Sequence, residues 1–127
     1  MKYLLDTHIL LWFFDVPSKL SEQDRNIILD PNSEIYVSIA SAWEFAIKAS
    51  LKKLDLKGGV GAFLRAIKKN GFILLPIKSE HLKCVETLPF HHRDPFDRLL
   101  IATAMKEGLG LVTDDEKMKL YALDVVS

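Results

Sequence analysis

Two aspartates, Asp94 and Asp97, lie three residues apart in the segment HHRDPFDRLLIATA, directly before a run with helical periodicity. Asp94 precedes Pro95, and this order is typical of an N-cap residue followed by proline in the first position of a helix. Asp97 then falls in the first turn, where a carboxylate closes a weak capping box or interacts favourably with the helix dipole. The segment alone therefore does not separate a structural aspartate from a reactive one, and other carboxylates have to decide.

Three further acids follow expected strands or open expected helices. Asp6 comes directly after the apolar strand 2–5, and Asp115 comes just past the short strand GLVT. Glu44 lies on the helix that follows the strand EIYVS. Each acid also has an ordinary explanation: an N-cap for Asp6, a turn or cap for Asp115, and for Glu44 an exposed ion pair with Lys48, worth about 0.3–0.5 kcal/mol.

Strand and helix patterns alternate along the chain. We expect helices beginning near residues 7, 22, 41, 60, 79 and 95, and strands at 2–5, 34–38, 72–77, 110–113 and 124–126, with 72–77 buried. This order predicts an α/β fold with a central, mostly parallel sheet flanked by helices. No repeat and no linker rich in Pro, Gly or Ser divides the sequence, so we expect one domain over residues 1–127.

On such a frame the four acids Asp6, Glu44, Asp97 and Asp115 converge, because sites in parallel α/β sheets lie beyond the carboxyl ends of the strands. Like charges raise one another's pKa, so a cluster of this kind is expected to persist only if a cation normally neutralises it. Oxygen ligands with open positions suit Mg²⁺ or Mn²⁺. Two such ions can activate a water and stabilise the leaving oxygen in phosphodiester cleavage.

Composition sets further bounds. Hydrophobic residues make up 49% of the chain and charged residues 27%, which is typical of a globular protein with a real core. No apolar run approaches the roughly 20 residues of a membrane helix, and the single cysteine, Cys84, cannot form an internal disulfide, so we expect a cytosolic protein without membrane association. Net charge is zero. Basic residues are concentrated in the middle of the sequence, and a solvated helix face explains this concentration as well as a phosphate-binding surface does. These residues are Lys48, Lys52, Lys53, Lys57, Arg65, Lys68 and Lys69.

Four ordered segments, LLDTHILLW, SAWEFAIK, HHRDPFDRLLIATA and LVTDDEKM, resemble the PIN domain, and in particular the VapC-type toxin ribonucleases of bacterial toxin–antitoxin pairs. The resemblance covers essentially the whole chain. It implies a metal-dependent endoribonuclease that cleaves RNA, in which Asp6, Glu44 and Asp97, with Asp115 as a weaker fourth ligand, bind Mg²⁺ or Mn²⁺. It also implies a homodimer and a cognate antitoxin whose tail enters the acidic groove.

The resemblance also separates the two aspartates of the first segment. In the family, small residues follow the third acid at five and seven positions, which fits Ala102 and Ala104 counted from Asp97. Asp94 is then the cap or an outer partner of the site. Arg98 either contacts substrate phosphate or forms a surface ion pair with Asp94.

The fourth acid is assigned in the same way. The family's Thr-x-Asp pattern fits Thr113 and Asp115, and the adjacent Asp114 is the alternative. Thr7 and Thr113 either hydrogen-bond ligand carboxylates or a metal-bound water, or serve as cap and turn residues.

Other side chains are set aside as sites. His91 and His92 are adjacent, and adjacent histidines seldom face one metal, while Cys84 with His81 forms only half of a zinc site. His8 is expected to be packed or exposed rather than catalytic. Four aromatic residues are assigned mainly to the core, with a dimer interface or a partner groove as the alternative. They are Trp12, Phe13, Phe14 and Trp43.

Two other functions compete with the ribonuclease. An aspartyl-phosphate phosphoacceptor or hydrolase needs a second acid close to its nucleophile in sequence or at the middle strand, and LLDTHIL does not supply one. A non-catalytic RNA- or protein-binding relative does not require the intact set of acids. Cleavage of RNA with Mg²⁺ or Mn²⁺, and not with EDTA, separates these functions.

Overall fold

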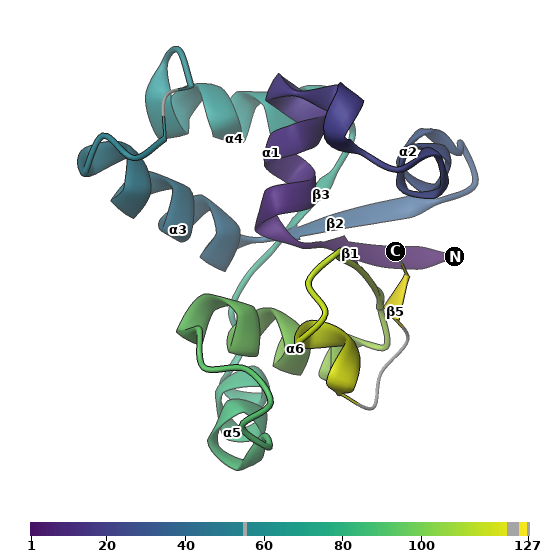
Figure 1. Ribbon diagram of the computed structural model, residues 1–127, viewed down its shortest axis with the longest axis vertical. Helices are drawn as coiled ribbons and strands as arrows, with labels where there is room; N and C mark the ends of the chain where they lie inside the picture. The colour runs from purple at the N-terminus through teal and green to yellow at the C-terminus, as the bar shows by residue number, and fades with distance from the viewer. Residues whose placement is uncertain (55, 122–124, 127) are drawn as a thin grey trace.

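Five parallel strands form the central sheet, in the order β3–β2–β1–β4–β5 (Figure 1). The computed structural model describes residues 1–54, 56–121 and 125–126. Neighbouring strands pair in parallel throughout, which confirms the predicted α/β fold. The strands are β1 (Lys2–Leu5), β2 (Glu34–Ser38), β3 (Ile73–Leu75), β4 (Gly110–Val112) and β5 (Val125–Val126).

Helices make the crossovers between these strands, as parallel pairing requires. Figure 1 shows α1, α2 and α4 on one side of the sheet and α5 and α6 on the other. The helices are α1 (Thr7–Asp15), α2 (Glu22–Leu29), α3 (Ile39–Ser50), α4 (Gly59–Lys69), α5 (Ser79–Thr87) and α6 (Pro95–Glu107), with the short 3-10 helices η1 (Pro17–Lys19) and η2 (Met118–Leu120).

The sheet has an apolar core on each face. Leu5 and Val112 belong to the core that includes buried residues of α1, α3 and α4, whereas Leu4 and Leu111 belong to the core that includes α6. Consecutive strand residues divide between the two cores because their side chains point to opposite faces. Strands β1 and β4 are therefore packed on both faces, and this packing positions the residues that follow them.

Local capping defines the start of α6. The side chain of Asp94 accepts hydrogen bonds from the backbone N–H groups of Phe96 at 2.9 Å and Asp97 at 3.1 Å. The helix ends at Gly108, whose φ of 67° is the left-handed conformation that glycine adopts without strain. The predicted N-cap role of Asp94 is thus confirmed.

Two predicted elements differ from the structure, and a third lies partly outside the described residues. Helix α3 begins at Ile39, before the expected residue 41, because the Ser38 hydroxyl accepts from the Ala40 N–H at 3.0 Å and caps it. Strand β3 was expected to be buried, and this is wrong: it lies at the edge of the sheet and exposes Ile73 and Leu74. The last strand is present, although its expected first residue, Asp124, lies outside the described residues.

Candidate metal centre

The carboxyl ends of β1 and β4 meet where the strand order reverses. The crossovers from β1 lead toward β2 and β3, and the chain then returns to place β4 on the other side of β1. Sheets of this topology bind ligands at such a reversal. Asp6 follows β1 there, and its backbone N–H donates to the carbonyl of Val112 at the end of β4, at 3.0 Å.

All four predicted acids contribute to one negative field at this edge. Asp6 and Glu44 are buried, with 2% and 3% of their surface exposed. The side chains of Asp97 and Asp115 are 13% and 33% exposed. The site thus grades from a closed end at Asp6 and Glu44 to an open end at Asp115.

Burial and mutual repulsion shift the protonation of these groups. Burial, followed by repulsion from Asp6, Asp94, Glu44 and Asp115, raises the pKa of Asp97 to about 8. Burial also raises the pKa of Asp6, with a smaller contribution from Glu44, against the hydrogen bond that it accepts from Thr113. A proton or another cation therefore stabilises the cluster near neutral pH.

Two oxygen atoms at the closed end have no hydrogen-bond partner among the described residues. Oδ1 of Asp6 and Oε1 of Glu44 are buried and accept no hydrogen bond from the residues that the structure describes. Buried acceptors without partners are costly. Oxygen atoms of this kind fit a hard divalent ion such as Mg²⁺ or Mn²⁺.

Thr113 connects two of the acids. Its Oγ1 donates to Oδ2 of Asp6 at 2.7 Å and accepts from the N–H of Asp115 at 3.0 Å. Both open roles for Thr113 are therefore observed: its hydroxyl donates to a carboxylate, and it accepts from the N–H two residues on, as in a turn. Thr7 instead pairs with Ser41, Oγ1 to Oγ at 2.8 Å, and sequence reasoning did not identify Ser41.

Asp115, rather than its neighbour, faces the cluster. Its side chain lies beside His92 and repels Asp97, whereas Asp114 is exposed and its charge acts on Asp24. Burial favours the neutral form of Asp115, but hydrogen bonds from His92 and from the Lys117 N–H outweigh it and lower its pKa.

His92 is the residue that sequence reasoning missed. Its Nε2 lies 3.0 Å from Oδ2 of Asp97 and 2.9 Å from Oδ2 of Asp115, and ligand atoms of all three residues lie within 4.8 Å of one another. The one signal in the sequence was its position two residues before the cap of α6.

The ion pair between Glu44 and Lys48 forms, but it is not the exposed pair expected from the sequence. Oε2 of Glu44 lies 2.8 Å from Nζ of Lys48, and the carboxylate end is buried. The hydrogen bond to Glu44, and the charges of Asp94 and Asp97, raise the pKa of Lys48. Lys48 is therefore part of the site's electrostatics, whereas the other basic residues of this region are exposed.

Both roles considered for Arg98 are wrong. Its guanidinium is buried and donates to the backbone carbonyls of Val85, Leu88, Pro89 and His92. It therefore neither reaches the surface nor pairs with Asp94 among the described contacts.

A second group of possible ligands lies between α5 and α6. Ligand atoms of Glu80, His81 and Glu107 lie within 4.8 Å of one another. Nδ1 of the buried His81 accepts from the Lys78 N–H at 3.1 Å, and its Nε2 lies 2.8 Å from Glu107. These contacts join the two helices and account for the histidine without a metal.

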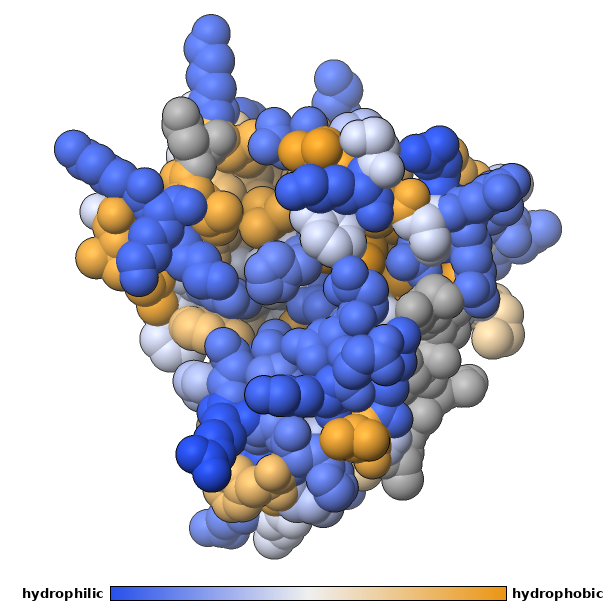
Figure 2. All heavy atoms as spheres, in the orientation of Figure 1, coloured by the Kyte–Doolittle hydropathy of each residue, from blue (hydrophilic) through white to orange (hydrophobic). Residues whose placement is uncertain are grey.

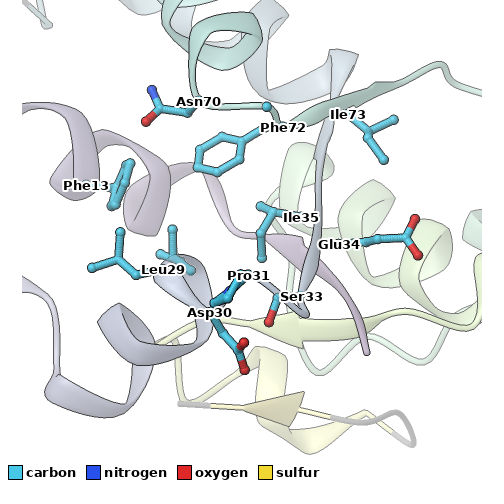
Figure 3. Close-up of a pocket in the computed structure, with 12 residues that line it drawn as sticks. Phe13, Leu29, Asp30, Pro31, Ser33, Glu34, Ile35, Asn70, Phe72 and Ile73 are labelled. Atoms are coloured by element: carbon cyan, nitrogen blue, oxygen red, sulfur yellow. The ribbon is translucent and has the colours of Figure 1, made fainter.

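One cavity lies away from the acids. It has a volume of about 360 Å³ and is lined mainly by the end of α2, the start of β2 and the start of β3. Figure 3 shows Phe13, Leu29 and Phe72 around it, with the carboxylates of Asp30 and Glu34 pointing away from these apolar side chains. These are the amino ends of the strands, opposite the acidic cluster.

The surface near the acids is polar. Figure 2 shows hydrophilic side chains over the region where α6 and the segment between β4 and η2 lie in Figure 1. Of the helices that the structure describes, none has the length and apolar character needed to span a bilayer.

Comparisons with a family model and with a known relative agree on the family of this chain. The model of the PIN domain matches residues 3–123. Ribonuclease VapC22 of Mycobacterium tuberculosis is 28% identical over 118 residues, which are 93% of this chain and 90% of that protein.

Solved structures share the fold. The structure of VapBC2 from Rickettsia felis, bound to a DNA fragment from its promoter, superposes on this chain with a TM-score of 0.75. The sequence identity is 19%, and the match covers 99% of this chain and 98% of that chain. A toxin–antitoxin complex from Klebsiella pneumoniae gives a TM-score of 0.68 at 17% identity, over 98% and 96%.

Proposed function

The chain belongs to the PIN domain family, and we propose that it is a metal-dependent endoribonuclease that hydrolyses phosphodiester bonds in RNA. It is homologous to a VapC-type ribonuclease. The observation that carries the proposal is the cluster of carboxylates at the carboxyl ends of β1 and β4, with buried oxygen atoms of Asp6 and Glu44 that lack partners among the described residues.

In this proposal Asp6, Glu44 and Asp97 hold the metal, and Asp115 assists at the open end. Mg²⁺ or Mn²⁺ is the expected ion, because the donor set consists of carboxylate oxygens. When bound, the ion supplies positive charge that activates a water and stabilises the leaving oxygen. The carboxyl of Asp97, with its pKa near 8, gives up its proton when it becomes a ligand.

The relatives suggest the biological setting. The solved structures include toxin–antitoxin complexes, and we propose that this chain is the toxin of such a pair and acts on RNA in the cytoplasm. Its partner is then an antitoxin protein. An arginine from that protein fits the negative field at the open end of the site and would compete with the metal for the carboxylates.

We also propose that the toxin is a homodimer. Trp43 and Ile47 on α3, and Leu51 at its C-cap, recur at intervals of four residues, and all three are exposed, Trp43 by 57%. An exposed apolar stripe of this kind is typical of a surface that a partner covers.

Cleavage of RNA by the purified protein tests the proposed activity. We expect cleavage with Mg²⁺ or Mn²⁺, none with EDTA, and none by Asp97→Asn with either ion. A non-catalytic PIN-domain protein would bind RNA without cleaving it under any of these conditions. Persistent cleavage in EDTA by both proteins would exclude the metal mechanism.

A further inference from the structure

The segment between α5 and α6 is folded around the buried guanidinium of Arg98. One terminal nitrogen of the guanidinium donates to the carbonyls of Pro89 at 3.0 Å and His92 at 3.2 Å. The other donates to the carbonyls of Val85 at 3.1 Å and Leu88 at 3.2 Å. One cation therefore binds the last carbonyls of α5 and the loop that follows, where the helix dipole also favours positive charge.

Tyr121 holds the same loop. Its hydroxyl donates to the Pro89 carbonyl at 2.6 Å and accepts from the His92 N–H at 3.0 Å. Both backbone polar groups of His92 are thus bonded, the N–H to Tyr121 and the carbonyl to Arg98. The position of the His92 backbone is set by residues that do not touch the acids in the described contacts.

The ring of His92 is oriented just as closely. The backbone N–H of Asp94 points at Nδ1, at 3.1 Å, and a backbone N–H can only donate. Nδ1 is therefore the acceptor, and a neutral ring carries its proton on Nε2. That Nε2–H donates to Oδ2 of Asp115 at 2.9 Å, and Oδ2 of Asp97 lies 3.0 Å from the same nitrogen.

This arrangement decides between two roles for His92. A metal ligand needs a lone pair on Nε2, which would move the proton to Nδ1 and set it against the Asp94 N–H. A hydrogen-bond donor needs the arrangement that is observed. Asp97 lies in the first turn of α6 and Asp115 follows β4, so one ring nitrogen lies against carboxylates from two separate elements that otherwise repel.

We propose that His92 is a positioning residue of the metal centre, which donates from Nε2 to Asp97 and Asp115 and holds both carboxylates in place for the ion without binding it. The proposal rests on the proposed function only in taking this cluster as the metal centre. Arg98, Tyr121 and the Asp94 N–H act through His92, because they set its place and its tautomer.

Metal affinity without RNA tests the proposal. We expect His92→Phe, which keeps a ring and removes the donor, to weaken Mn²⁺ binding about 10- to 100-fold in an electron paramagnetic resonance titration. His92→Gln, whose amide can accept from Asp94 and donate to the acids, should recover part of this loss. His91→Phe is the matched control, since His91 is exposed and lies edge-on against the Tyr121 ring at 5.0 Å. Wild-type affinity in His92→Phe would overturn the proposal.

The nitrogen NMR spectrum of the His92 ring in the wild-type protein is a second test, and it does not depend on the folding of a variant. At pH 8 we expect a protonated Nε2 and an unprotonated Nδ1, unchanged when diamagnetic Mg²⁺ is added to saturation. Loss of the Nε2 proton on adding Mg²⁺ would make His92 a ligand, and protonation at Nδ1 would contradict the geometry. Failure of the wild-type protein to bind Mn²⁺ or cleave RNA would instead overturn the proposed function, and the spectrum without metal would still report the tautomer.

Discussion

The hydroxyl of Thr113 donates a 2.7 Å hydrogen bond to Oδ2 of Asp6, across a separation of 107 residues in the sequence. This bond joins the residue that follows β1 to the residue that follows β4. It supplies the one hydrogen bond that a side chain of the described residues makes to the buried Asp6 carboxyl, whose other oxygen has no partner there.

Thr113→Val should therefore destabilise the metal-free protein by about 1–3 kcal/mol, the cost of leaving a buried acceptor unpaired. Valine has nearly the same shape, so packing changes little. Urea unfolding in EDTA measures the difference. Thr113→Ser keeps the hydroxyl and should lose less stability; equal losses in both variants would assign the effect to packing.

The raised pKa of Asp97 predicts how stability depends on pH without metal. The folded-state pKa is about 8, against the ordinary value of 3.8 that applies to the unfolded chain, so the folded protein binds the proton more tightly than the unfolded one. The stabilisation from this proton is complete below about pH 4 and is lost as pH rises through 8. Melting in EDTA between roughly pH 5.5 and 8.5 should show a steeper decline in the wild type than in Asp97→Asn, which keeps only the smaller set of raised groups such as Asp6.

In EDTA at pH 8, Asp97→Asn should match or exceed the wild type in stability, because it removes one of the repelling charges. Metal should reverse that order of stability. An ion that binds only the folded state stabilises it by about 2.7 kcal/mol at a hundredfold excess over its Kd. We expect Mn²⁺ to raise the melting temperature of the wild type at pH 8 and to have little effect on Asp97→Asn. A wild type indifferent to Mn²⁺, with Asp97→Asn less stable than the wild type in EDTA, would mean that the carboxylate is structural.

Substitutions of Asp94 and of Asp97 should have different effects on RNA cleavage. Asp94→Ala removes two hydrogen bonds at the start of α6 and should cost about 1 kcal/mol of stability. Cleavage should remain measurable, because the Asp94 N–H that orients His92 is a backbone group. Asp97→Asn should fold and be inactive, and the opposite pattern would exchange the two roles.

Arg98→Lys should disturb the metal centre from a distance. A single ammonium cannot replace a guanidinium that reaches four carbonyls. We expect lower stability in urea and weaker Mn²⁺ binding, although Arg98 touches none of the four acids in the described contacts. Reduced stability with wild-type Mn²⁺ affinity would show that the loop does not control the site.

The exposed stripe on α3 predicts the effect of a charge on assembly. Ile47→Glu should convert the proposed dimer to a monomer, because an unpaired carboxylate is costly to bury in an interface. Light scattering after size-exclusion chromatography reports the mass. Lys68→Glu places a carboxylate on the exposed part of α4 as a control, and a dimer that survives Ile47→Glu would place the interface elsewhere.

The sequence by itself determined the features that depend on near neighbours in the chain. The order of strands and helices follows from hydrophobic periodicity, and the cap at Asp94 follows from the proline beside it. The expected convergence of Asp6, Glu44, Asp97 and Asp115 followed from a general rule, because parallel strands bring their carboxyl ends to one edge. Their assignment as ligands rests on the resemblance to the family and stays a prediction.

Only the tertiary structure decided which side chains support these acids. Arg98 lies one residue after Asp97 in the sequence, yet it points into the loop between α5 and α6, and His92 reaches two acids from separate elements. The burial of Glu44, the exposure of β3 and the bond from Thr113 to Asp6 likewise depend on packing between distant segments. Periodicity and capping describe about one helical turn of chain at a time, so contacts across 107 residues have no local signal.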